Sequence, residues 1–334
     1  MKRFVALLLL LCLLLPAAAL GEEKLPRLSF YEANIVGYTQ DPLPIRLDIR
    51  SSGSLNSAKT LELRNQDGRV LATREFKPGT TGSITIKVET DDTYAGGHDL
   101  SVWCDGMQVS IDSAYCAITD KHRKAVVKVD TQQPFMSISF DCCYVDTPTD
   151  EILQILDEFG LKTTFFMAGE FLKEFPESAK KIRDAGHEIG CHSLSHPHLL
   201  SYHLDMRFKQ VRRNVEMVRE TLGIVPRLFR PPFGEFDVTI SAPARAEGME
   251  MCLWTIDSHD WDWNFRKEQV VRQVTKDVGP GTIILFHLDG FFTPDVLREV
   301  IPYYENTLGL TLVPITELMA IGGLDLPASP YLNE

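Results

Sequence analysis

Between residues 24 and 130, short runs of alternating apolar and polar residues follow one another along the chain. A period of two is typical of strands that bury one face, and pairs such as Asp67-Gly68 and Asp105-Gly106 indicate turns between the runs. The alternating runs lie at residues 28–31, 45–49, 61–63, 84–88 and 100–103. Short strands at this spacing predict a small antiparallel β-sandwich of the immunoglobulin-like kind.

From about residue 133 the pattern changes to a repeated strand, loop and helix. Residues 135–140 are typical of a buried strand, and apolar residues at helical spacing after Thr149 predict a helix that ends at Gly160. Further strands are predicted at residues 163–167, 188–191, 227–230, 249–256, 282–287 and 310–313, and the clearest helices at 206–222, 268–278 and 294–304. About seven β/α units in succession predict a parallel barrel or an open parallel sheet.

The first residues of the chain differ from both regions. Lys2 and Arg3 precede an apolar run at residues 5–15, and Ala17-Ala18-Ala19 offers a cleavage site, which together are typical of a secretory signal peptide. The run is too short to span a membrane comfortably. We therefore expect a signal peptide at residues 1–21, a β-sandwich domain at 22–130, a (β/α) barrel domain at 131–334, and an exported, soluble protein with no membrane span after cleavage.

Charge and cysteine content narrow the partners and the compartment. The net charge of −12 over 334 residues is spread along the chain without a Lys/Arg run, which argues against nucleic acid and against an anionic membrane surface as partners. Nothing in the sequence predicts a protein partner. Export would permit disulfides, and Cys104 and Cys116, on either side of a hairpin signal, could form one or remain free.

Polar residues gather directly after the predicted strands of the second region. In a parallel barrel the carboxyl ends of all strands meet at one rim, which is where such folds place their chemistry. Each residue alone has a structural explanation, such as a helix cap for Asp141, an ion pair for Arg230 or a buried core position for His287. Their recurrence at the same phase of successive β/α units indicates a shared site. The groups are Asp141, His192 with His196, Arg230 to Gly234, Asp257 to Trp261, and His287.

The order and spacing of these groups resemble the five motifs of the polysaccharide deacetylases, carbohydrate esterase family 4 with its NodB-homology domain. The matching stretches are Phe140-Asp141, His192-Ser193-Leu194-Ser195-His196, Arg230-Pro231-Pro232-Phe233-Gly234, Asp257-Ser258-His259-Asp260-Trp261 and Leu285-Phe286-His287. The resemblance covers about residues 135–320. It implies a distorted (β/α)7 barrel that removes acetyl groups from N-acetylglucosamine polymers with a bound divalent metal, usually zinc.

The resemblance also implies which residues perform the chemistry. His192 and His196 would hold the metal as neutral imidazoles. Asp141 would be the general base that takes a proton from the attacking water. His287 would be the general acid that protonates the departing amine nitrogen.

Five further residues would support these groups, again by resemblance. Arg230 would keep the base carboxylate ionised, and Asp260 would keep the acid imidazole protonated. The backbone N–H of Phe233 would stabilise the oxyanion. Trp261 and Leu285 would line the acetyl pocket.

The first motif departs from the family pattern. The family carries two adjacent aspartates, the second of which is the third metal ligand, whereas here Cys142 follows Asp141 and Cys143 stands where glycine is usual. Three interpretations stay open: Cys142 binds the metal as a thiolate, Asp146 supplies the missing carboxylate, or the site binds metal weakly or not at all.

These observations predict a secreted, metal-dependent hydrolase that removes N-acetyl groups from peptidoglycan or a chitin-like polysaccharide. The alternative is a catalytically silent carbohydrate-binding protein on the same fold, because the second aspartate is missing. The enzyme is favoured because a silent relative need not keep Asp141, Arg230, Asp260 and His287 together.

Overall fold

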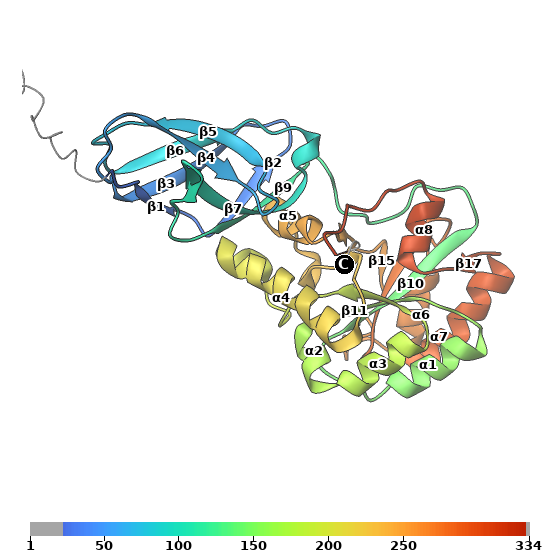
Figure 1. The fold of residues 1–334 in the computed structure, drawn as a ribbon. Coiled ribbons are helices and arrows are strands. Elements are labelled where there is room, and N and C mark those ends of the chain that lie inside the picture. Colours follow the sequence, from blue (N-terminus) through green and yellow to red (C-terminus); the bar gives the residue numbers. More distant parts are fainter. Residues whose placement is uncertain (1–22, 332–334) are drawn as a thin grey trace, which may run out of the picture. The chain divides into compact units, whose positions relative to one another are not determined.

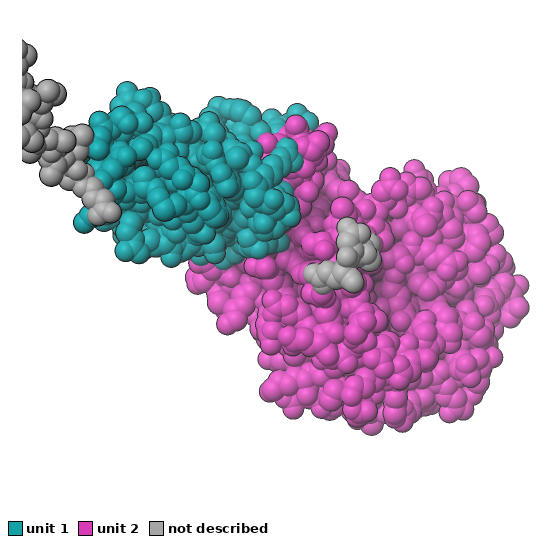
Figure 2. All heavy atoms as spheres, in the orientation of Figure 1, with its two compact units in different colours: residues 1–35, 40–90, 98–116 teal, residues 36–39, 91–97, 117–334 magenta. Residues whose placement is uncertain are grey.

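The computed structural model of the protein describes residues 23–331, so the predicted signal peptide lies outside the described residues. The chain divides into two compact units (Figure 2). Unit 1 comprises the chain up to Ile35 together with Gln40–Thr90 and His98–Cys116, and unit 2 comprises Val36–Thr39, Asp91–Gly97 and the chain from Ala117 onward. None of the helices within residues 23–331 has the length and apolar character needed to cross a membrane.

The N-terminal region is built from two β-sheets, and each predicted strand there coincides with an observed one. One sheet has the order β1-β3-β6 and the other β2-β9-β7-β4-β5, with β8 paired to β7. The strands are β1 (Arg27–Phe30), β2 (Asn34–Tyr38), β3 (Leu43–Ser51), β4 (Lys59–Arg64), β5 (Val70–Phe76), β6 (Ser83–Val88), β7 (Gly96–Cys104), β8 (Met107–Gln108) and β9 (Ala114–Thr119).

The burial pattern of each strand explains whether it could be predicted from the sequence. Side chains of β6 alternate strictly between exposed and buried. The strand β5 lies at the edge of its sheet and buries little, so its sequence lacks the alternating pattern and it was not predicted. Cys104 and Cys116 are both buried free thiols, so the disulfide considered for them is not formed.

Unit 2 contains a parallel sheet with helices around its outside, a mixed α/β fold as predicted (Figure 1). The sheet order is β14-β13-β12-β11-β10-β16-β15, and β17 also pairs with β10. The strands are β10 (Phe135–Cys142), β11 (Thr164–Met167), β12 (Glu188–Cys191), β13 (Leu228–Phe229), β14 (Glu250–Met251), β15 (Ile256–Asp257), β16 (Ile283–His287) and β17 (Thr311–Leu312).

The helices follow the strands along the chain and bury one apolar face each. They are α1 (Thr149–Glu158), α2 (Gly169–Glu174), α3 (Pro176–Asp184), α4 (Leu204–Leu222), α5 (Val238–Ala246), α6 (Lys267–Thr275), α7 (Thr293–Pro302) and α8 (Ile315–Ile321). Shorter helical turns are η1 (Asp92–Tyr94), η2 (Leu199–Ser201), η3 (Pro232–Gly234) and η4 (Tyr303–Thr307).

The strand predicted at residues 249–256 is wrong. This stretch forms two short strands, β14 and β15, which are the two edges of the sheet. The segment 125–129 runs along the β14 edge, because Val126 N–H donates to the Met251 carbonyl at 2.8 Å and the Leu253 N–H donates to the Val126 carbonyl at 2.8 Å. It then reaches the start of β16, where Val129 N–H donates to the Gly281 carbonyl at 2.9 Å. We call residues 125–129 the seam segment.

Replacing Gly281 by alanine is expected to lower the free energy of unfolding by roughly 1–3 kcal/mol. Gly281 has a φ of 75°, and a Cβ atom there would lie 1.8 Å from the Val129 carbonyl oxygen of the seam segment. Urea unfolding followed by circular dichroism measures the loss. Gly279→Ala is the matched control, since a Cβ there meets nothing within 4 Å. Equal stability of the two variants would contradict the strained contact.

Candidate active site

The alternation of side chains along β10 buries the first candidate residue, Asp141, on the opposite face of the strand from the hydrophobic core. Met136, Ile138, Phe140 and Cys142 belong to the hydrophobic core. The residues between them face the other way, and Asp141 is among these, with 3% of its surface exposed. The period of two therefore separates Asp141 from its neighbour Cys142.

Arg230 holds the Asp141 carboxylate from the end of β13. Its guanidinium donates to Asp141 Oδ1 at 2.8 Å and to Ser139 Oγ at 2.9 Å, and it is fully buried. It also donates to the carbonyls of Cys252 and Leu253. Burial disfavours an ionised carboxylate, but the interactions of Asp141 with His192, with the Arg230 guanidinium and with His287 together outweigh burial, so the pKa of Asp141 lies below its ordinary value. The carboxylate is thus ready to accept a proton.

His192 follows β12 and has one ring nitrogen fixed by the backbone. Its Nδ1 lies 2.7 Å from the Arg230 carbonyl, which can only accept, so the proton of a neutral ring sits on Nδ1. Burial lowers the pKa of His192, which favours the neutral ring. Its Nε2 is then a buried acceptor without a hydrogen-bond partner, and it lies 3.3 Å from Asp141 Oδ2. Two acceptors at this distance require a proton or a cation near them.

His196 lies on the same loop, close to His192, and its ring faces the same space. The ring centroids of the two histidines are 4.8 Å apart. Burial lowers the pKa of His196 to about 3, so its imidazole is neutral. The Tyr144 hydroxyl lies 3.0 Å from His196 Nδ1 and orients the ring.

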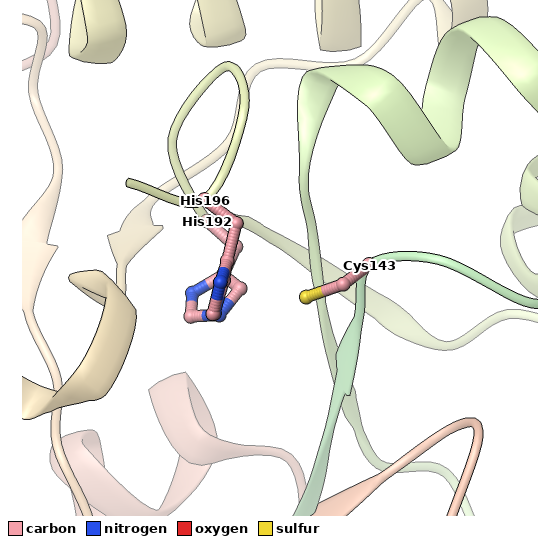
Figure 3. A group of neighbouring side chains, drawn as sticks. All are labelled: Cys143, His192 and His196. Carbon is pink, nitrogen blue, oxygen red and sulfur yellow. The ribbon is translucent and has the colours of Figure 1, made fainter. Parts of the chain in front are cut away.

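Cys143 completes a group of three potential metal ligands. The Cys143 sulfur and one ring nitrogen each from His192 and His196 all lie within 4.8 Å of one another, and the side chains point toward a common space (Figure 3). Thiolate and imidazole ligands suit zinc. Burial raises the pKa of the Cys143 thiol well above its usual value, while a coordinated cation deprotonates a thiol. The donor set and the unpartnered Nε2 of His192 therefore fit a divalent metal.

The two groups considered for the third ligand from the sequence lie elsewhere. Cys142 packs in the hydrophobic core, and its sulfur is 3.9 Å from the Phe140 carbonyl. Asp146 accepts a hydrogen bond of 2.6 Å from Ser178 Oγ. Neither belongs to the cluster around the two histidines, and Cys143 was missed as a candidate. The signal that could have found it is the alternation of β10, which puts Cys143 on the same side as Asp141.

His287 and Asp260 form a second buried pair. His287 Nδ1 lies 2.8 Å from Asp260 Oδ1, and its backbone N–H donates to Asp260 Oδ2 at 3.0 Å. Ser258 Oγ and Thr293 Oγ1 also donate to this carboxylate, at 2.8 and 2.6 Å. Burial alone would lower the pKa of His287, but the hydrogen bond and charge of Asp260 raise it to about 9. His287 therefore carries its proton at neutral pH.

A pocket of about 390 Å³ brings most of these predicted residues together. Asp141 and His287 are neighbours in the β10–β16 register and both line the pocket. The sequence did not single out Tyr144, Trp254 and Asp289, which also line it. Besides Asp141 and His287, the predicted site residues that line the pocket are His196, Phe233, Trp261 and Leu285.

Comparison with known proteins gives consistent matches. Residues 128–252 match the polysaccharide deacetylase family. A peptidoglycan-N-acetylglucosamine deacetylase of Bacillus cereus is 31% identical over 164 residues, which cover 47% of this chain and 58% of that protein. The peptidoglycan-N-acetylmuramic acid deacetylase PdaC of Bacillus subtilis is 28% identical over 190 residues, covering 57% and 40%. The chain spans between 40% and 60% of the length of the first curated relatives that it matches.

A solved structure shares the fold. A pseudoenzyme of carbohydrate esterase family 4 from Bacillus anthracis superposes with a TM-score of 0.58 at 23% identity, covering 70% of this chain and 87% of that one. At this identity the similarity concerns the fold alone.

Proposed function

We propose that the protein is an exported, metal-dependent hydrolase that removes N-acetyl groups from glycans containing N-acetylglucosamine, because residues 128–252 match the polysaccharide deacetylase family. The observation that carries this proposal is a single pocket that both Asp141 and His287 line. One is a buried carboxylate kept ionised by Arg230, and the other is an imidazole kept protonated by Asp260. A base and an acid with opposite pKa shifts are what amide hydrolysis requires.

In this proposal Asp141 is the general base. Its Oδ1 is bound to Arg230, so Oδ2 is the oxygen that takes the proton of the attacking water. The lowered pKa keeps the carboxylate unprotonated at neutral pH. Such a proton transfer is worth about 10²–10⁴-fold in rate.

His287 is the general acid. Its Nδ1 is engaged by Asp260, so Nε2 is the nitrogen that gives a proton to the departing amine. Asp260 cannot rotate away, because Ser258, Thr293 and the His287 backbone all donate to it. The fixed imidazole therefore keeps its direction throughout the reaction.

A divalent metal, in the proposal zinc, would be held by His192 and His196. When bound, it would polarise the amide carbonyl and lower the pKa of a bound water toward about 7. The neutral state of both imidazoles, favoured by burial, supports this role.

Three residues would position the substrate. Phe233 has a φ of 58°, and its backbone N–H is the proposed second stabiliser of the oxyanion. The Trp261 and Leu285 side chains line the same pocket and would enclose the acetyl methyl group. The glycan would be peptidoglycan or a chitin-like polymer, a choice that the names of the relatives support. Export is supported by the signal peptide predicted from residues 1–21.

Release of acetate tests the proposed function directly. The protein, supplied with Zn²⁺ or Co²⁺, is incubated with acetylated chitooligosaccharides and with peptidoglycan fragments. Acetate is expected from at least one substrate, and chelator treatment should abolish its release. Protein with stoichiometric metal that releases none from either would refute the proposal.

A second candidate function is a silent carbohydrate-binding protein. It is favoured by one observation, that cysteines follow Asp141 where the family carries a second aspartate. Glycan binding by calorimetry, together with no acetate release and no bound metal, is the result that would establish this candidate.

Asp260→Asn is expected to shift the alkaline limb of the pH–rate profile to lower pH. In the native protein kcat/KM should fall as the pH rises through about 9, because the acid His287 then loses its proton. Without the Asp260 carboxylate, the largest effects that raise the pKa of His287 are lost, while burial still lowers it and the charges of Asp141 and Asp257 raise it only in part. Activity should therefore begin to fall at a lower pH than in the native protein.

Acetate release measured from pH 5 to pH 10 checks this shift. Asp262→Asn, in the same loop, is the matched control because Asp262 bonds Asn264 rather than His287. If the alkaline limb of Asp260→Asn were unchanged, His287 would not be the general acid.

A further inference from the structure

We infer that Cys143 is the third protein ligand of the metal, as a thiolate beside the imidazoles of His192 and His196. The site would then take a borderline-soft cation such as Zn²⁺ or Co²⁺ in preference to Mg²⁺ or Ca²⁺. This inference rests on the proposed function, because it specifies how the metal of that site is held.

The backbone of β10 puts Cys143, and not Cys142, at the metal site. Cys142 is the last residue of the strand, pairs in register with Met167, and packs into the hydrophobic core. Cys143 is the next residue and returns to the side of Asp141, where it lines the same pocket. The adjacent cysteines therefore face opposite sides of the strand.

The three donor atoms form a compact and largely dry cluster. All lie within 4.8 Å of one another, and Cys143 and His192 expose 7% and 1% of their surface. The Cys143 sulfur points from the end of β10 toward the two imidazoles of the loop after β12 (Figure 3). Coordination would release the thiol proton to solvent as the metal–sulfur bond forms.

Groups behind the imidazoles already orient them for a cation. The Arg230 carbonyl fixes the proton of His192 on Nδ1, which leaves the unpartnered Nε2 aimed into the cluster. The Tyr144 hydroxyl lies 3.0 Å from Nδ1 of His196 and fixes the orientation of this ring beside the cluster. Outer contacts of this kind are typical of histidines that bind metals.

The rival third ligand is the Asp141 carboxylate. Its Oδ2 is 3.3 Å from His192 Nε2, but it is not a member of the three-residue cluster and its other oxygen is held by Arg230. Carboxylate and thiolate ligands differ in metal preference and in spectrum, so an experiment can separate them.

The full chain loaded with one equivalent of Co²⁺ tests the inference. A thiolate-to-cobalt charge-transfer band in the near ultraviolet is expected in the native protein and in Cys142→Ser, the matched control. The band should be absent in Cys143→Ser, whose affinity for Zn²⁺ in chelator competition should fall by at least the roughly 10–100-fold that the loss of an outer-shell partner costs. Persistence of the band in Cys143→Ser, or its loss only in Cys142→Ser, would overturn the inference.

X-ray absorption of the zinc-loaded native protein gives a result that needs no variant. A sulfur scatterer at about 2.3 Å is expected, whereas nitrogen and oxygen scatterers alone would overturn the thiolate ligand. Because these readouts do not depend on acetate release, they separate the two proposals. A zinc–sulfur bond without acetate release would support Cys143 as a ligand and reject the proposed hydrolase. Acetate release without a zinc–sulfur bond would support the hydrolase and reject Cys143 as a ligand.

Discussion

Asp141→Asn is expected to lower the rate of acetate release by about 10²–10⁴-fold. Asparagine has nearly the same shape and can still accept a hydrogen bond from Arg230, but it cannot take a proton from water. Because the three-residue ligand cluster does not include Asp141, zinc content should be unchanged. The measurement is kcat for acetate release, normalised to bound zinc.

The matched control for this variant is Asp146→Asn. Asp146 lies in the chain segment after β10 and accepts a hydrogen bond from Ser178, away from the cluster. It should keep nearly all activity. If Asp141→Asn were as active as this control, Asp141 would not be the base, and loss of zinc from it would make Asp141 a metal ligand instead.

Arg230→Met is expected to lower the free energy of unfolding by about 3–5 kcal/mol. The guanidinium is fully buried, and its removal leaves the Asp141 carboxylate buried without its charged partner. Ser139 Oγ and the carbonyls of Cys252 and Leu253 also lose their donor. Urea unfolding measures the change.

The double variant Arg230→Met with Asp141→Leu should recover much of this loss, because replacing both members of a buried ion pair avoids an unpaired charge. Arg213→Ala serves as the surface control. Its ion pair with Glu216 is nearly half exposed and should contribute no more than about 1 kcal/mol. A loss for Arg230→Met as small as for this control would show that the buried pair has little energetic weight.

The sequence predicted which candidate residues lie close together better than it predicted the bounds of the strands. The motif residues could be found because each follows a buried strand, and parallel strands bring their carboxyl ends together. The run at residues 249–256 was predicted as one strand because its apolar residues are continuous. Continuity of apolar residues does not reveal that the chain leaves one edge of the sheet and joins the other.

The candidate third metal ligand could not be identified from the sequence for a different reason. Family resemblance directs attention to the position directly after Asp141, which is Cys142. Side-chain direction in a strand alternates, however, and in this chain the core takes Cys142 while Cys143 returns to the pocket. Tyr144 could not be predicted for another reason: its contact with His196 joins residues 52 positions apart in the sequence.

The seam segment has a consequence for how this unit can be separated from the rest of the chain. Residues 125–129 supply backbone partners to Met251 and Gly281, yet they precede the boundary expected at residue 131, and the family match begins at residue 128. A chain cut at either position would lose Val126 and leave the β14 edge without these bonds. A shortened protein that is meant to fold as this unit should therefore begin before residue 125, so that the seam segment is retained.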